Sequence, residues 1–140
     1  MINIVIPMAG AGSRFAKAGY KNPKPFIDVL GKPMICHVLD NLNIPDAKFI
    51  LLTRFEHYNN EQETVKWIKS NYKVEFVMID KLTEGAACTV LHAHRLINND
   101  TPLLIANSDQ IVDMDISEYI NDSKKRGLDG SVPVSYTHLR

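Results

Sequence analysis

The chain has 140 residues, of which 45% are hydrophobic and 23% are charged, and its 16 Lys and Arg balance its 16 Asp and Glu. This length and composition predict one globular domain with a core of its own. The zero net charge argues against a nucleic-acid protein held by bulk charge, although a single nucleotide needs only a few local cations. No apolar stretch of about 18 residues and no signal peptide is found, so we expect a cytoplasmic protein with no membrane partner.

Short apolar segments alternate with helical patterns along the chain. The apolar segments are continuous rather than alternating, which is typical of strands in a sheet that is covered on both faces. In chain order we expect strands at 2–6, 48–53, 74–79, 103–106 and 131–134, and helices at 33–42, 60–72, 84–97 and 116–126. This order predicts an α/β fold with a doubly wound, mostly parallel sheet and right-handed crossovers.

Residues 7–32 interrupt this alternation with a long loop that is rich in glycine and proline. Long loops inside compact domains are usually functional or disordered. This loop leaves the carboxyl end of the first expected strand, which is where open α/β sheets bind their ligands. Candidate functional residues are therefore expected in this loop.

The loop begins with the segment Met8–Phe15, which reads MAGAGSRF. Gly10 and Gly12 allow a tight turn that brings backbone N–H groups close to a ligand, and such a nest of donors suits phosphate oxygens. Arg14 adds a fork of donors with a permanent charge. An ordinary tight turn with a solvated Arg14 is the alternative. A dinucleotide fingerprint fits less well, because Phe15 stands where that motif needs its third glycine.

Four motifs occur in order: GAGSRF at 10–15, NPKPF at 22–26 followed by GKPMI at 31–35, TEGAA at 83–87, and NSDQ at 107–110. Together they resemble the N-terminal signature of the sugar-phosphate nucleotidyltransferases, also called NDP-sugar pyrophosphorylases. The resemblance implies a Rossmann-like GT-A nucleotidyltransferase fold. It also implies that TEGAA forms a second nucleotide loop and that NSDQ forms an acidic metal-binding turn.

The resemblance also assigns roles to individual residues. It implies that Arg14 and Lys24 are catalytic, that Asp109 holds Mg²⁺, and that the nucleotide is bound by Ala9, Gly10, Gly12, Ser13, Asp80, Glu84, Gly85 and Ala86. The expected reaction is an in-line attack by an anionic phosphate on the α-phosphorus of a nucleoside triphosphate, with pyrophosphate leaving. Such a site must neutralise charge, and one or two carboxylates suffice for Mg²⁺.

The second nucleotide loop bears on the choice of base. Relatives that read uracil or thymine often place Gln five residues before the loop glycine, and the corresponding residue here is Asp80. An ionised carboxylate only accepts hydrogen bonds, and cytosine offers an amino donor where uracil and thymine offer a carbonyl. An acceptor at Asp80 or Glu84 would therefore favour CTP, with UTP and dTTP left open.

The resemblance implies an acceptor-binding half that also supplies a second metal ligand. We interpret residues 1–134 as the nucleotide-binding part of a truncated domain whose acceptor half is missing, and 135–140 as a non-native tail. The expected acceptor is a sugar phosphate or a similar phosphorylated metabolite, as in polysaccharide biosynthesis, and a homo-oligomer is left open. Two other functions remain open: a GT-A glycosyltransferase, against which Arg14 and Lys24 argue, and a non-catalytic nucleotide-binding domain.

Several other residues have simpler interpretations. Asp115 is expected to cap the helix that begins near residue 116, with an Asp-x-Asp metal site at 113–115 as the alternative. Cys36 and Cys88 are too few for a disulfide scaffold, indicate a reducing compartment and are expected to be small core residues. Arg54 and His57 follow the second strand and lie at the same edge of the sheet as the loops above.

Overall fold

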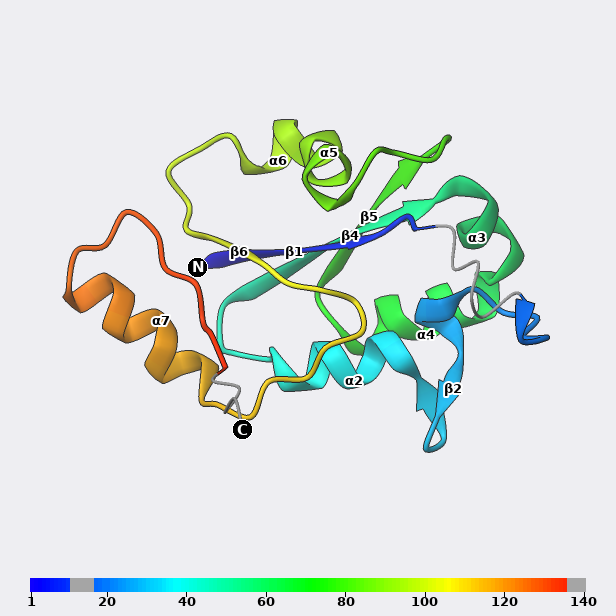
Figure 1. Cartoon of the computed structure of the whole chain (residues 1–140), viewed down its shortest axis with the longest axis horizontal. Coiled ribbons are helices and arrows are strands. Elements are labelled where there is room, and N and C mark those ends of the chain that lie inside the picture. The colour runs from blue at the N-terminus through cyan, green and yellow to red at the C-terminus, as the bar shows by residue number, and fades with distance from the viewer. Residues whose placement is uncertain (11–16, 136–140) are drawn as a thin grey trace, which may run out of the picture.

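The computed structural model describes residues 1–10 and 17–135 (Figure 1). Its centre is a four-stranded sheet in the order β5-β4-β1-β6, in which all neighbouring strands are parallel. The strands are Ile2–Met8 (β1), Ala47–Arg54 (β4), Val74–Ile79 (β5) and Leu103–Ile105 (β6). All of β1 pairs with β4, from Ile2 opposite Ala47 to Met8 opposite Thr53. The predicted α/β fold with a mostly parallel sheet is confirmed.

Helices cover the sheet on both faces, so the sheet is doubly wound (Figure 1). On one face lie α2 (Met34–Asn41), α4 (Gln62–Asn71) and α7 (Ile116–Lys125). On the other lie α5 (Ala86–Val90), the 3₁₀ turn η2 (Leu91–Ala93) and α6 (His94–Ile97). The remaining helix, α3 (Phe55–Asn60), follows β4 directly.

The central strand β1 shows how the sequence produces two cores. Side chains alternate across a strand, so Ile4 and Ile6 join the core under α2 while Val5 joins the core under α5. All three residues are fully buried. Their β-branched side chains pack well on a pleated surface that is covered on both sides.

The strand order creates a crevice at one point of the sheet. From β1 the chain builds β4 and β5 on one side, and then crosses to place β6 on the other side of β1. The strand order therefore reverses between β1 and β6, and ligands of open α/β sheets bind outside the carboxyl ends of the strands at such a switch point.

The long loop after β1 contains three short elements: η1 (Lys24–Phe26), β2 (Asp28–Val29) and β3 (Lys32–Pro33). β2 and β3 form an antiparallel hairpin whose turn has positive φ at Leu30 and Gly31. The hairpin is held to α2, because Nε2 of His37 donates to the Val29 carbonyl at 2.5 Å.

A polar cluster fastens the same hairpin to α2 and α4. Asp40 on α2 accepts hydrogen bonds from Lys32 and, at 2.5 Å, from the Tyr72 hydroxyl. Burial alone would raise the pKa of Asp40, but these two hydrogen bonds and the positive charge of Lys32 outweigh it and lower that pKa. Burial, followed by the nearby Asp40, raises the pKa of the Cys36 thiol to about 11. The bond from Lys32 in β3 to Asp40 in α2 thus holds the hairpin against the helix.

The helix expected at 60–72 is confirmed as α4, and the separate helix α3 before it was not expected. Three other expectations were wrong. The helix expected at 84–97 is divided into α5, η2 and α6. Residues 131–134 form no strand, because Ser131 is held to α7 through the Tyr119 hydroxyl. Cys88 is exposed, because its neighbours Thr89 and Val90 face the sheet instead; Cys36 is buried as expected.

Other expectations concern the helix cap and the ends of the described region. Asp115 caps α7 as predicted, accepting from the Glu118 N–H at 3.1 Å. Of the tail expected at 135–140, residues 136–140 lie outside the described residues. Within residues 1–10 and 17–135, none of the helices combines the length and the apolar character that crossing a bilayer requires.

Candidate functional site

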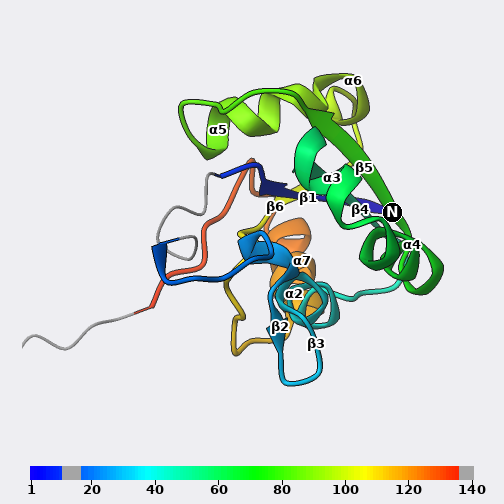
Figure 2. The ribbon, with the colours of Figure 1, turned by 90° about the vertical axis from the view of Figure 1, so that its right-hand side faces the viewer.

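A pocket of about 320 Å³ lies at the carboxyl ends of β1 and β6, at the switch point of the sheet. Figure 2 shows the end of β1 between α5 on one side and the η1–β2 segment on the other. Four parts of the chain line the pocket: Pro7, Met8, Ala9 and Gly10; Lys24 and Pro25; Thr83, Gly85, Ala86 and Thr89; and Asn107, Ser108 and Asp109.

One ion pair carries the charge of this pocket. Nζ of Lys24 lies 2.6 Å from Oδ2 of Asp109, although the two residues are 85 positions apart in the sequence. They are the only charged side chains among the described lining residues. Both are about one-third exposed, and an exposed ion pair adds little to stability. The consequence of the pair is therefore local: it holds a cation and a carboxylate together at the pocket.

The two partners reach the pocket for different reasons. Lys24 lies in η1 between Pro23 and Pro25, whose fixed φ angles restrict the backbone on either side of it. Asp109 follows β6 in a turn in which the Asn107 amide donates to Gln110 at 2.7 Å. Both therefore come from short, shaped segments at the same edge of the sheet.

The opposite wall is the segment that enters α5. Gly85 has φ 146° and ψ 175°, a backbone conformation that is essentially reserved for glycine. Its carbonyl accepts from the Thr89 hydroxyl at 3.0 Å, and the Thr83 and Thr89 hydroxyl oxygens lie 2.5 Å apart. This wall presents uncharged hydrogen-bonding groups to the pocket.

The structure brings together six of the residues that the sequence analysis assigned to a site. Ala9, Gly10, Lys24, Gly85, Ala86 and Asp109 all line the pocket. Asp80 and Glu84 are exposed and do not belong to the lining. Gly12, Ser13 and Arg14 lie outside the described residues. Sequence reasoning placed Thr83 in the second nucleotide loop without a role of its own, and it missed Thr89, although Thr89 follows Gly85 by one helical turn.

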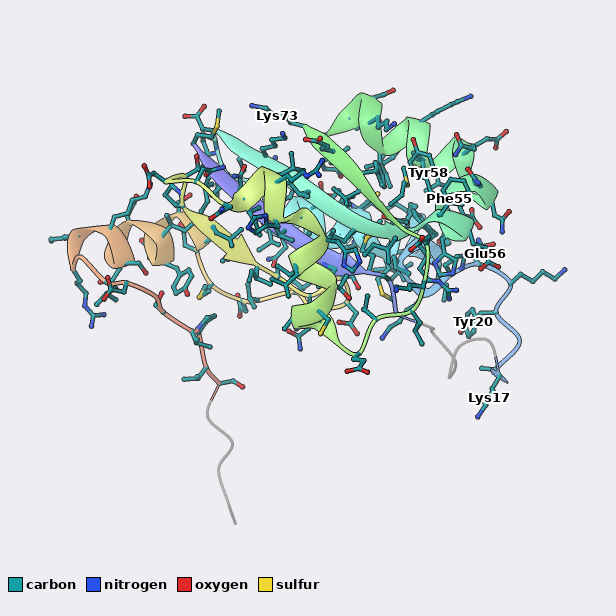
Figure 3. The ribbon with its side chains drawn as sticks, turned by 90° about the horizontal axis from the view of Figure 1, so that it is seen from above. Lys17, Tyr20, Phe55, Glu56, Tyr58 and Lys73 are labelled. Atoms are coloured by element: carbon teal, nitrogen blue, oxygen red, sulfur yellow. The ribbon has the colours of Figure 1, made fainter. Side chains whose placement is uncertain are left out.

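A second hollow of about 200 Å³ adjoins the pocket and shares Gly10 and Lys24 with it. His57 also lines it, and among the described residues no group hydrogen-bonds the buried Nδ1 of His57. Burial, followed by the positive charge of Arg54, lowers the pKa of His57, while Glu56 opposes the shift. Burial also raises the pKa of Glu61 in the same wall. Figure 3 shows Glu56 and Tyr20, which line this hollow too, at one end of the molecule.

Metal binding at the first pocket depends on few ligands. Across residues 1–10 and 17–135, no three His, Cys, Asp or Glu side chains form a group that could hold a metal ion. Mg²⁺, however, usually takes one or two carboxylates and completes its octahedron with water and substrate phosphates. The Asp109 carboxylate beside the oxygen-bearing side chains of Asn107 and Ser108 fits that requirement.

Comparison with known sequences identifies the family. The family model described as Nucleotidyl transferase matches residues 4–138, and the chain belongs to this family. The bifunctional protein GlmU of Methanococcus vannielii is 31% identical over 127 residues, which are 91% of this chain and 29% of GlmU. A mannose-1-phosphate guanyltransferase of Yarrowia lipolytica is 28% identical over 91% of this chain and 36% of its own length.

Solved structures agree on the fold. The nucleoside-diphosphate-sugar pyrophosphorylase of Vibrio cholerae RC9 matches with a TM-score of 0.63 and 26% identity, over 83% of this chain and 52% of that one. HddC of Yersinia pseudotuberculosis, in a complex with GMP-PN, matches with a TM-score of 0.70 and 23% identity, over 88% and 54%. The chain thus spans about half of these structures and about a third of the curated relatives.

Proposed function

We propose that this chain is the nucleotide-binding part of an enzyme that transfers a nucleoside monophosphate from a nucleoside triphosphate to a sugar phosphate. The observation that carries the proposal is the Lys24–Asp109 pair, set in a pocket at the switch point of the sheet. Family membership supports the reaction class. Because nucleoside triphosphates are cytoplasmic substrates, we also propose that the protein acts in the cytoplasm.

The reaction follows from the charges that the pocket must bring together. An oxygen of the acceptor phosphate attacks the α-phosphorus, and the bond from that phosphorus to the oxygen bridging to the β-phosphorus breaks. Pyrophosphate leaves with the electron pair. Two anions meet in this step, so positioning and charge neutralisation supply most of the catalysis. No protein base is required, because the attacking oxygen is already anionic.

The residues of the pocket divide this work. Lys24 would contact the phosphates near the reacting phosphorus, and the backbone at Ala9 and Gly10 would hold the triphosphate together with Gly12 and Ser13. Arg14 would bind the departing pyrophosphate. Asp109 would hold Mg²⁺, which when bound neutralises phosphate charge. In the structure Asp109 accepts from Lys24, so the carboxylate that would hold Mg²⁺ lies beside the cation that would contact the phosphates.

The base is proposed more finely as cytosine, with UTP and dTTP as alternatives. The support from the sequence is the acceptor character of Asp80 and Glu84 in the second nucleotide loop, of which Thr83, Gly85 and Ala86 line the pocket while Asp80 and Glu84 do not. The relatives bear names that point to several bases, among them a guanyltransferase and UDP-glucose pyrophosphorylases. The base that this chain prefers therefore has to be inferred from its own second nucleotide loop.

The test is Mg²⁺-dependent binding of CTP, UTP, dTTP, ATP and GTP, measured by calorimetry. Hydrogen bonds to charged groups contribute enough that Lys24→Met should weaken binding roughly 10- to 100-fold. Asp109→Asn should remove most of the Mg²⁺ dependence, and Arg14→Ala should weaken the triphosphate more than the monophosphate.

Lys48→Met is the matched control. Lys48 pairs with Glu75 at the same 2.6 Å distance and with similar exposure, but it lies near the amino end of β4, away from the pocket. Its loss should leave binding unchanged. Equal effects of Lys24→Met and Lys48→Met, or a folded chain that binds no triphosphate, would overturn the proposal.

A further inference from the structure

Two threonines form a closed hydrogen-bond arrangement in the wall of the pocket. Thr89 is 4% exposed, and its hydroxyl lies 3.0 Å from the Gly85 carbonyl oxygen and 2.5 Å from the Thr83 hydroxyl oxygen. The Thr83 hydroxyl lies 3.4 Å from the same carbonyl. Thr83 is only partly buried and lines the pocket.

The two hydroxyl protons can be assigned from these distances. The Gly85 carbonyl can only accept, and Thr89 is its nearer donor, at 3.0 Å against 3.4 Å. Once the Thr89 proton points to that carbonyl, the Thr89 oxygen accepts the proton of Thr83. Each hydroxyl has one proton and two acceptor lone pairs. Both protons are then used inside the loop, and Thr83 offers only lone pairs to the pocket.

The charges of the pocket indicate which part of a ligand reaches this wall. Lys24 and Asp109, the only charged groups among the described lining residues, suit a polyphosphate and its metal ion. Thr83 and Thr89 belong to the uncharged wall that leads into α5. A nucleotide whose phosphates lie at the ion pair would therefore present its base or sugar to the threonines.

We propose that Thr83 determines base specificity by accepting a hydrogen bond from an exocyclic amino group, and that Thr89 is the positioning residue that fixes this polarity. The inference rests on the proposed function and deepens it. It moves base selection from Asp80, which is exposed and outside the lining, to Thr83. The exocyclic amino group of cytosine can donate to the Thr83 hydroxyl oxygen. The carbonyl of uracil or thymine at the same place would face the Thr83 lone pairs, and would need Thr83 to give up its bond to Thr89.

The experiment compares the dissociation constants of CTP and UTP for the wild type and four variants. A single hydrogen bond corresponds to roughly a three- to tenfold change in affinity. Thr83→Val should weaken CTP by about that factor and leave UTP within about twofold. Thr89→Val should instead strengthen UTP, because the Thr83 proton loses its nearer acceptor, the Thr89 oxygen at 2.5 Å, and only the Gly85 carbonyl at 3.4 Å then competes with the uracil carbonyl for it. Thr83→Ser and Thr89→Ser keep the hydroxyls and should keep the preference for CTP.

Thr83→Val thus reduces the preference for CTP by weakening CTP, and Thr89→Val reduces it by strengthening UTP. A purely structural role of the two threonines would not give these opposite effects. Circular dichroism and thermal unfolding verify that each variant is folded. Equal weakening of both nucleotides by Thr83→Val, or a wild type that binds UTP as tightly as CTP, would overturn this inference and leave the proposed function intact. A folded wild type that binds no triphosphate would overturn the proposed function, and this inference with it.

Discussion

The two faces of the sheet are built very differently. Among the described residues, the core under α2, α4 and α7 contains sixteen buried residues, whereas the core under α5, η2 and α6 contains seven. The helices of the first face are also longer than those of the second. Those of the first face are 8 to 10 residues long, and the segments of the second face have 5, 3 and 4 residues (Figure 1).

This difference separates stability from recognition. Segments as short as α5 and α6 are marginal on their own, so their positions depend on contacts with the sheet and on local hydrogen bonds. Thr83, Gly85 and Thr89, which form one wall of the pocket, belong to this lightly packed face. Binding elements are commonly found at the low-stability end of a structure. We expect substitutions on the first face to change unfolding, and substitutions on the second face to change binding.

The largest effect is expected from Leu39→Ala on α2. Leu39 is fully buried in the larger core, and truncation of such a leucine removes apolar contacts and leaves a cavity. The free energy of unfolding should fall by about 3 kcal/mol, measured by urea denaturation. Leu30→Ala, at a side chain that is 93% exposed, is the control and should change it by less than about 0.5 kcal/mol. A change in nucleotide affinity of folded Leu39→Ala would break the separation of the two faces.

Gly85→Ala tests the second face. An added Cβ would meet no atom within 4 Å, so the only cost is the strained backbone at φ +146°. Such strain amounts to about 1–3 kcal/mol, and the short loop can relieve it by changing shape. Triphosphate binding should therefore weaken by roughly tenfold or more, while the unfolding midpoint moves less than in Leu39→Ala. Gly130→Ala has open space and no positive φ, and should change neither. Unaltered binding by Gly85→Ala would show that the shape of this loop does not matter.

The larger core could be predicted from sequence because local patterns and burial agree there. Continuous β-branched strands such as Ile2–Met8 and the spacing of Ile35, Val38 and Leu39 on α2 lead to the observed layers. Strand direction also predicted that the loop after the first strand and the turn after the fourth strand lie at one sheet edge, because the carboxyl ends of parallel strands meet there. The choice of Lys24 and Asp109 within these segments came from the resemblance to the nucleotidyltransferases, and the structure pairs the two side chains.

The smaller face could not be predicted to the same depth. The break of the expected helix at 84–97 and the pairing of Thr83 with Thr89 depend on backbone angles, chiefly those of Gly85. Asp80 was selected by its count from the loop glycine, but an offset does not determine where a side chain points after a strand ends. Register within a loop is a tertiary property, so the base-reading group required the structure.

A smaller effect is expected from Asp115→Ala on the first face. The Asp115 carboxylate accepts from the Glu118 N–H at the start of α7, and loss of an N-cap costs about 1 kcal/mol. Urea denaturation should show that loss, with nucleotide binding and its Mg²⁺ dependence unchanged. Asp113→Ala, two residues earlier and exposed, is the matched control and should have little effect on unfolding. Loss of Mg²⁺ dependence in either variant would instead support the Asp-x-Asp metal site.

The smallest effect is expected from His57, which lies on α3 and lines the second hollow. Burial, followed by the charge of Arg54, lowers the pKa of His57 in the folded protein below its ordinary value near 6.5. As the pH falls below about 6.5, the unfolded chain therefore takes up a proton that the folded chain resists, and stability decreases. Above that pH the imidazole is neutral in both states and the contribution is constant. His57→Gln should remove this part of the acid sensitivity.

Carboxylates whose pKa is lowered, such as Asp40, also make stability fall in acid. The difference in unfolding free energy between wild type and His57→Gln is therefore compared at two pH values. At pH 8 the difference reports only the change in packing, because the imidazole is neutral in both states. The further change in that difference between pH 6.5 and pH 5 reports the protonation of the imidazole. The gap between the two proteins should shrink as the pH falls. A gap that stays constant from pH 8 to pH 5 would mean that the folded protein accommodates the imidazolium. The hollow beside Lys24 would then tolerate a second positive charge. The charges proposed to bind the phosphates at this end of the pocket would then have to include His57.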